Sequence, residues 1–237
     1  MNSSEIITQL QSLASEKYKA NVVKMGIPED HCIGVSTGEV RSIAKKIGKS
    51  NELAFELWDT GYHEARLLAV LVFDQKGLTH ADIEKLMGEV VSWDLCDHLC
   101  KNLIAKMKDY EKFIDQWITS DHIYKKRAAF TLIATSAIHN KKLSNDTLDN
   151  YLHLIKEAQD IEHEHVKKAI AWALKEIGKR DFDYNEKALL TAHELLSSGN
   201  KTQQWIAKDA IKELETMVKV EGRTRLISTK TQMGKDA

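Results

Sequence analysis

Four segments of this chain share a pattern in which a basic residue precedes a small, apolar helical run. The first residues of successive segments are 61, 41 and 40 residues apart. Their sequences are Arg66-Leu-Leu-Ala, Arg127-Ala-Ala-Phe, Lys168-Ala-Ile-Ala and Lys208-Asp-Ala-Ile. A pattern that returns at a nearly constant interval indicates an array of similar structural units, each of which contacts only its neighbours.

The length of the interval favours one class of array. Two-helix HEAT-type units span roughly 40 to 47 residues, and the longer first interval indicates that one period is irregular. The sequence therefore predicts an all-α protein, a curved α-α superhelix (solenoid) of HEAT-like helical repeats. Each unit in such a stack is rotated slightly from the last, so the inner helices line an extended concave groove that suits a long ligand.

Composition and local signals agree with a helical chain, because there is a single proline and 29% of the residues are charged. An amphipathic helix is expected over 2–24, followed by a loop over 26–38. Ser36 and Glu39 have the spacing of a capping box at a helix start, and Gly48 is expected to end that helix. Further helices are expected near residues 51–59, 62–75, 79–91, 93–107, 110–118, 122–138, 144–158, 163–178, 185–197 and 202–219.

The repeats predict a single HEAT-like repeat domain over residues 1–220. The segment that follows, 221–237, has little apolar content and includes the cations Arg225 and Lys230. Such a segment buries too little apolar surface to offset the entropy of ordering it. We therefore expect residues 221–237 to be a flexible C-terminal tail.

Cysteine usage and hydropathy bear on the compartment. Cys32, Cys96 and Cys100 are an odd number of cysteines, which favours free thiols in a reducing setting. The first residues do not resemble a signal peptide. Eighteen consecutive apolar residues occur nowhere, whereas a membrane span needs roughly twenty. We expect a cytoplasmic protein without a membrane segment, and a monomer.

The formal net charge of -1 excludes a chain that is basic throughout, so a polyanionic partner would have to meet local clusters of Lys and Arg. Lys125, Lys126 and Arg127 form one such cluster, and consecutive cations can bind a phosphate backbone. Stacked repeats would also align the basic residues that open the four segments, namely Arg66, Arg127, Lys168 and Lys208. A charge run is more often a solvated helix face, and that alternative stays open.

The densest candidate site is the segment from Ser92 to His98. Trp93 and Asp97 are four residues apart, so they share one side of a helix. The apolar stripe runs through Val91, Leu95, Leu99 and Leu103, with Trp93 at its margin and Asp97 just beyond. A carboxylate at the edge of an aromatic wall is suited to stabilising a developing cation. The simpler alternative is that Asp94 or Asp97 caps the helix or pairs with a lysine such as Lys101.

Trp172 is a second candidate. On the helix expected over 163–178, the residues Val166, Ala169, Ile170, Ala173 and Ile177 form the buried stripe. Trp172 falls outside that stripe, beside lysines. An aromatic side chain in that position indicates a contact surface, and packing against the adjacent repeat is the alternative.

Two short patterns raise the question of a metal site. Cys96, His98 and Cys100 alternate along one helix, and residues 162–165 read Glu-His-Glu-His. At 3.6 residues per turn, His98 points about 160° away from both cysteines, so the three side chains cannot converge on one ion. We expect no metal and no cofactor, and we expect Cys96 and Cys100 to be buried thiols.

Three motifs, in order along the chain, resemble those of the AlkD-type alkylpurine DNA glycosylases, a DNA alkylation repair enzyme family. They are Trp93-Asp94-x-x-Asp97, Lys126-Arg127-Ala128-Ala129 and Lys168-Ala169-Ile170-Ala171-Trp172-Ala173-Leu174. The match extends to Gly34-Val35-Ser36 with Arg41, and to Trp205-Ile206-Ala207-Lys208-Asp209-Ala210. The resemblance implies a HEAT-like array that grips duplex DNA with alkylated bases and excises N3- and N7-alkylated purines.

The resemblance also implies roles for individual residues. Asp97 matches the catalytic carboxylate, Trp93 and Trp172 match an aromatic pair beside the damaged nucleotide, and Arg127 matches a phosphate contact. An alkylated purine is a cationic leaving group, so the sugar becomes oxocarbenium-like as the bond breaks. Asp97 would stabilise that charge and orient the attacking water, and the aromatic faces would attract the lesion. The resemblance implies that no base-flipping pocket is needed.

A function of another class stays open. A HEAT-like scaffold without chemistry could bind distorted DNA or a protein partner. Packing of Trp93 and Trp172 into the core would favour that scaffold.

Overall fold

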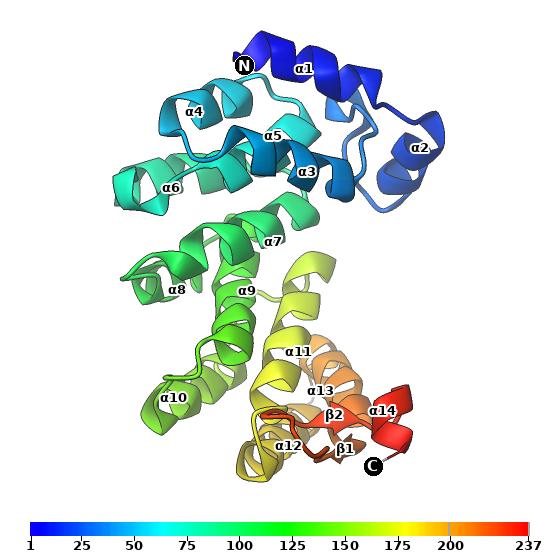
Figure 1. Ribbon diagram of the computed structural model, residues 1–237. Helices are drawn as coiled ribbons and strands as arrows, with labels where there is room; N and C mark the ends of the chain where they lie inside the picture. The colour runs from blue at the N-terminus through cyan, green and yellow to red at the C-terminus, as the bar shows by residue number, and fades with distance from the viewer. Residues whose placement is uncertain (199, 237) are drawn as a thin grey trace. The chain divides into compact units, whose positions relative to one another are not determined.

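The computed structural model describes residues 1–198 and 200–236, which form fourteen α-helices, three short 3-10 turns and one two-stranded sheet (Figure 1). The predicted all-α class is therefore confirmed. The chain divides into two compact units, residues 1–110 and 111–237. The single domain expected over 1–220 stays a prediction. Over the described residues, no helix is both long enough and apolar enough to cross a membrane.

The first unit is built from the helices α1 to α7. Helices α3, α5 and α7 lie side by side in that order, α4 packs on α5, and α1 contacts both α4 and α5 (Figure 1). The bounds are α1 Ser3–Ser12, α2 Glu16–Lys24, α3 Thr37–Ile47, α4 Asn51–Asp59, α5 His63–Val72, α6 His80–Gly88 and α7 Trp93–Asn102. Short 3-10 turns span Glu29–His31, Gln75–Gly77 and Ile104–Lys106.

The second unit has the paired helices expected of HEAT-like repeats. Helices α9, α11 and α13 form one layer, and they pair with α8, α10 and α12 respectively. The bounds are α8 Glu111–Trp117, α9 Ile123–His139, α10 Asn145–Lys156, α11 Glu164–Gly178, α12 Phe182–Ser197, α13 Lys201–Leu214 and α14 Gln232–Lys235. Strands β1 (Met217–Val218) and β2 (Ile227–Ser228) pair antiparallel, with Met217 opposite Ser228.

Side-chain caps explain where several helices begin. The Ser36 side chain accepts the N–H of Glu39 at the start of α3, which is one of the two hydrogen bonds of the predicted capping box, and Gly48 follows the last turn as predicted. The helix predicted over 2–24 is wrong, because the structure has two helices there. Ser15 breaks it: its side chain accepts the N–H of Tyr18 at 3.3 Å and starts α2.

The C-terminal segment packs against the second unit over its described residues. We expected a flexible tail over 221–237, but the described part, 221–236, folds back onto the second unit. Leu226 is 2% exposed and donates its N–H to the carbonyl of Lys179 at 2.8 Å. The Arg225 guanidinium donates to the carbonyls of Ala137 and Glu176 and to the Glu176 carboxylate. Partners within the second unit thus satisfy the Arg225 cation, and the flexibility of residues 221–237 stays a prediction.

Candidate functional site

Helix α7 carries the predicted Trp93 and Asp97, and both side chains are half-buried. The Trp93 indole donates its Nε1–H to the carbonyl of Met25, at the C-terminal end of α2, at 3.0 Å. Leu95, Leu99 and Leu103 are buried as expected, but Val91 is 52% exposed because it precedes the helix. The indole is therefore held by a second element, at the margin of the α7 core face.

Asp94 is hydrogen-bonded within the fold, as one of the alternatives from the sequence proposed. Its Oδ1 accepts from the Ser92 hydroxyl and from the Leu95 N–H, each at 2.8 Å. Its Oδ2 lies 2.8 Å from His63 Nε2, on the first residue of α5. Burial alone would raise the pKa of Asp94. The hydrogen bond and the charge of His63, together with the hydrogen bonds from Ser92 and Leu95, hold the pKa of Asp94 below its usual value. Asp94 thus ties the start of α7 to α5.

His98 is a second buried histidine on α7. Its Nε2 lies 3.1 Å from the carbonyl of Leu67, and its Nδ1 lies 3.1 Å from the side-chain nitrogen of Asn102. A carbonyl only accepts and an amide nitrogen only donates, so the proton belongs on Nε2 and the ring is neutral. Burial, with repulsion from Arg41, lowers the pKa of His98 to about 4.

The segment between α2 and α3 is fixed by Glu64, a carboxylate that is only 1% exposed. Glu64 Oε1 accepts the N–H groups of Gly34 at 2.7 Å and Val35 at 3.1 Å, and Oε2 accepts that of Ile33 at 2.8 Å. Burial and then Glu64 raise the pKa of the neighbouring Cys32 thiol to about 12. The segment between α2 and α3 is therefore held at both ends. Glu64 binds its last residues, and Met25, its first residue, binds the Trp93 indole.

Arg66 is bound within the first unit. Its Nε donates to the carbonyl of Trp58 at 3.2 Å, and its Nη1 donates to that of Glu89 at 3.1 Å. The guanidinium lies 5.1 Å from the centre of the Trp58 ring and pairs with the Glu89 carboxylate at 3.5 Å. Arg66 thus joins the ends of α4 and α6, and its predicted contact with DNA stays a prediction.

Lys126 and Arg127 are the most buried of the predicted DNA-binding cations, at 5% and 6% exposure. Lys126 Nζ donates to the carbonyls of Gln159 at 3.2 Å and Asp160 at 3.3 Å, and Arg127 Nη1 donates to that of His165 at 2.5 Å. These bonds attach α9 to the segment that enters α11. Their roles toward DNA stay predictions, as does that of the half-buried Lys125.

The other candidates of the second unit are more accessible. Trp172 is half-buried and lies off the buried stripe of α11, as its position in the sequence predicted. Lys168 is exposed and pairs with Glu164 at 2.9 Å. Lys208 is exposed on α13. Their contacts with DNA, and that of Trp172 with a damaged nucleotide, stay predictions.

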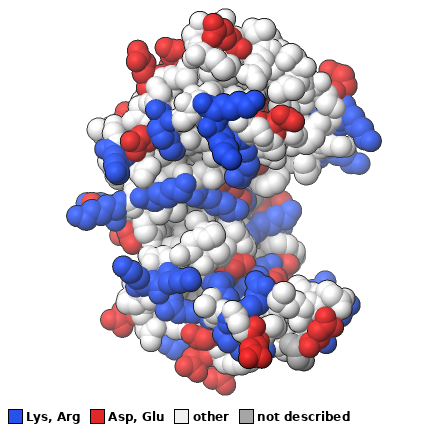
Figure 2. Space-filling view, in the orientation of Figure 1, with Lys and Arg blue, Asp and Glu red and all other residues white. Residues whose placement is uncertain are grey.

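Sequence reasoning overlooked one group of cations in the first unit. Arg41, Lys45 and Lys49 line a pocket of about 340 Å³ against Leu71, and Figure 2 shows Lys and Arg gathered over α3. Burial and Lys106 lower the pKa of Lys49. The four-residue spacing of Arg41 and Lys45, which places both cations on one side of a helix, was the signal available in the sequence.

A family model described as DNA alkylation repair enzyme matches residues 6–214. The chain belongs to this family. The motifs on α7, α9, α11 and α13 all lie within the matched range, so the predicted family membership is confirmed. Comparison with curated proteins gives no significant match.

A solved structure shares the fold of this DNA alkylation repair family member. It is described as belonging to a new family of proteins related to the HEAT-like repeat DNA glycosylases with affinity for branched DNA structures. The two chains are 24% identical, with a TM-score of 0.74, over 90% of this chain and 95% of the other. The HEAT-like repeat fold is therefore confirmed.

Cys32, Cys96 and Cys100 are buried, as predicted for Cys96 and Cys100. Within residues 1–198 and 200–236, no group of three or more His, Cys, Asp or Glu side chains is placed to hold a metal ion.

Proposed function

We propose that this family member is a DNA glycosylase that hydrolyses the N-glycosidic bond of N3- and N7-alkylated purines in duplex DNA, as a step of base excision repair. The observation that carries the proposal is the placement of Trp93 and Asp97 on α7. Both are half-buried and one turn apart, and the indole is held by Met25. The family gives the coarser role of DNA alkylation repair.

The chemistry requires little of the protein beyond charge and position. As the bond from C1′ to the purine nitrogen breaks, the electron pair leaves with the base and neutralises its alkylation charge. The sugar becomes oxocarbenium-like, the Asp97 carboxylate stabilises it, and a water oxygen adds to C1′ while the water loses a proton. The Trp93 ring face attracts the cationic base.

Asp94 has no part in this chemistry, because both of its oxygens are engaged by Ser92, Leu95 and His63. Its role is to position the first turn of α7. Arg41 and Lys45, which line the pocket on α3, supply cations for the phosphate backbone in the first unit. The Lys49 ammonium is engaged by the carbonyls of Leu71 and Phe73. Lys125, Lys168, Lys208 and Trp172 are the candidates in the second unit.

The decisive experiment measures release of free 7-methylguanine and 3-methyladenine from methylated duplex DNA. Asp97→Asn is compared with Asp115→Asn, which changes an exposed aspartate of α8. We expect Asp97→Asn to lower the rate by about 100-fold or more, and Asp115→Asn to leave it unchanged. Equal rates for wild type and Asp97→Asn would overturn the proposed role of Asp97.

A second candidate function is a scaffold that binds distorted DNA or a protein partner without excision. The observation in favour of this scaffold function is that the solved structure is described as belonging to a family with affinity for branched DNA structures. Methylpurine release at only the spontaneous rate, with DNA binding intact, would support this function and contradict the glycosylase.

A further inference from the structure

Three ring side chains occupy equivalent positions in successive repeats of the second unit. Tyr124 on α9 is followed by His165 on α11 after 41 residues and by Trp205 on α13 after 40. These are the intervals between Arg127, Lys168 and Lys208 in the repeat pattern. We call Tyr124, His165 and Trp205 the aromatic row. All three side chains are half-buried.

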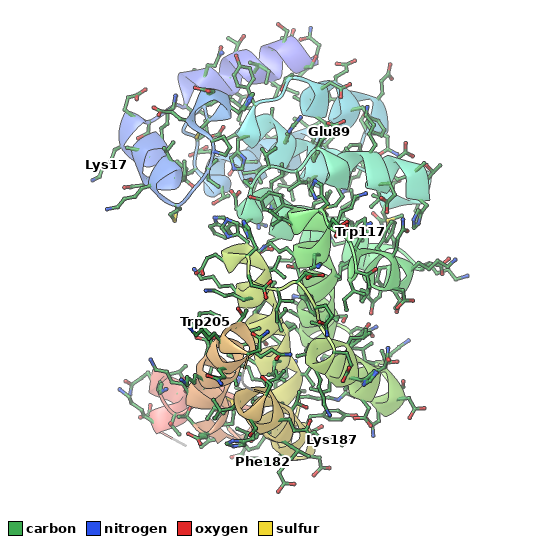
Figure 3. All side chains as sticks on the ribbon, turned by 180° about the vertical axis from the view of Figure 1, so that it is seen from behind. Lys17, Glu89, Trp117, Phe182, Lys187 and Trp205 are labelled. Atoms are coloured by element: carbon green, nitrogen blue, oxygen red, sulfur yellow. The ribbon has the colours of Figure 1, made fainter. Side chains whose placement is uncertain are left out.

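Contacts between neighbouring helices join Tyr124 to His165 and join Trp205 to α11. The Tyr124 and His165 rings are stacked, with centroids 6.1 Å apart and planes 24° apart, and His163 lies 5.2 Å from His165. Lys167 Nζ lies 4.7 Å from the centre of the Trp205 ring, which links α11 to α13. Figure 3 labels Trp205 on α13. The row therefore runs across three adjacent helices.

The surroundings of the row are locally basic, although the whole chain has a net charge of -1. Residues 121–127, 160–168 and 200–208 together contain seven Lys or Arg and four Asp or Glu. Burial, then Arg127, His163 and Lys168, lower the pKa of His165, which favours the neutral ring. Half-exposed rings beside cations are the combination that single-stranded nucleic acid requires, because bases stack on rings and phosphates meet cations.

Glu164 opposes this arrangement. Its carboxylate binds Lys167 at 2.6 Å and Lys168 at 2.9 Å, on the first turn of α11. These lysines hold the pKa of Glu164 at about 2, so the carboxylate is charged at every physiological pH. The Glu164 carboxylate thus neutralises Lys167 and Lys168, the two lysines closest in sequence to His165.

We propose that the aromatic row binds the unpaired bases of single-stranded DNA by stacking, with Lys167 and Lys168 on its phosphates, and that Glu164 weakens this binding by pairing with both lysines. The site lies entirely within the second unit. It shares Lys168 with the cations proposed to contact duplex DNA, and it contains none of the atoms proposed to act on the N-glycosidic bond. It gives the protein an affinity for DNA with unpaired segments in addition to its action on alkylated duplex.

The first test measures fluorescence anisotropy of a labelled oligothymidylate, alone and as a duplex with oligoadenylate, at one fixed salt concentration. We expect Trp205→Ala and His165→Ala to raise the Kd for the single strand by roughly 5- to 150-fold each, with a smaller effect on the duplex. Trp205→Phe keeps an aromatic face and is expected to retain most of the affinity. His153→Ala, an exposed histidine of α10, is the matched control.

The second test uses a gain of affinity, which misfolding cannot mimic. Glu164→Gln releases both lysines, so the Kd for the single strand should fall by about two- to fivefold. The dependence of log K on log salt should steepen by about 0.7 for each additional phosphate bound.

Two results would overturn the inference. One is single-strand binding that neither Trp205→Ala nor His165→Ala changes. The other is an equal loss for single strand and duplex, which would mark the row as a general phosphate-binding surface. Neither result depends on methylpurine release, so failure here and failure of the glycosylase proposal are separate outcomes.

Discussion

The carboxylate of Glu64 on α5 accepts the N–H of Gly34 at 2.7 Å, a bond between residues 30 positions apart in the sequence. Gly34 has φ of +98°, and a Cβ there would lie 2.9 Å from both the Lys19 Cβ and the Ser15 carbonyl oxygen. The loop backbone can thus turn its N–H groups toward one buried carboxylate only because residue 34 is glycine. This bond fixes the segment whose first residues bind Trp93.

We therefore expect Glu64→Gln to destabilise the protein. The substituted amide group presents N–H donors to backbone N–H donors, so at least one buried bond is lost, at a cost of about 3 kcal/mol in the free energy of unfolding. Urea unfolding followed by circular dichroism checks this. Glu56→Gln, at an exposed position of α4, should change the free energy by less than about 0.5 kcal/mol.

Trp93→Phe separates the aromatic face of Trp93 from its hydrogen bond. The phenyl ring keeps a face toward the cationic base but loses the Nε1–H that binds the Met25 carbonyl. We expect methylpurine release to slow by roughly 3- to 10-fold, the equivalent of one hydrogen bond, with little change in DNA affinity. An unchanged rate would show that Met25 does not position the indole for excision.

His98 makes the stability of the fold depend on pH. Its pKa is lowered to about 4 from 6.5, so the unfolded chain takes up the proton first as the pH falls. The stabilisation is complete above pH 6.5 and is lost progressively toward pH 4, for a total of about 3 kcal/mol. Unfolding free energies across this range should fall less steeply for His98→Gln than for wild type. The lowered pKa of Asp94 acts below this window.

Gly178 is a site where added volume cannot be accommodated. A Cβ at this last residue of α11 would lie 2.6 Å from Leu214 Cδ2 and 2.9 Å from Ala188 Cβ. We expect Gly178→Ala to lower the free energy of unfolding by about 1–3 kcal/mol. Gly88 ends α6 with no such neighbour within 4 Å. Gly88→Ala is the control, and thermal unfolding should show it to be neutral or slightly stabilising.

Arg225 tests whether the C-terminal segment contributes to stability. Replacing it with alanine removes the partner of Ala137 and leaves the buried Glu176 with Lys179 alone. We expect a loss of about 2–3 kcal/mol in the free energy of unfolding. Arg223→Ala, at an exposed position of the same segment, should cost less than about 0.5 kcal/mol. Equal effects of the two substitutions would contradict the packing of Arg225.

The helices could be predicted from sequence because their signals are local. The cap at Ser36, the buried stripe of α11 and the half-exposed position of Trp172 depend on residues within a few turns of one another, and the structure confirms them. The same local spacing placed Trp93 and Asp97 on one side of α7. The repeat interval then gave the pairing of the helices, because equivalent segments stack in order.

Other features were decided by tertiary contacts alone. Asp94 and Asp97 look alike in sequence, and only the position of His63 makes Asp94 structural. Lys126 and Arg127 read as a surface cluster, yet backbone carbonyls 33 and 38 residues away hold them inside the unit. Arg225 is ordered by partners 49 and 88 residues away. Helix formation follows local periodicity, whereas the fate of a charged side chain depends on which distant oxygen atoms the fold brings within hydrogen-bonding distance of it.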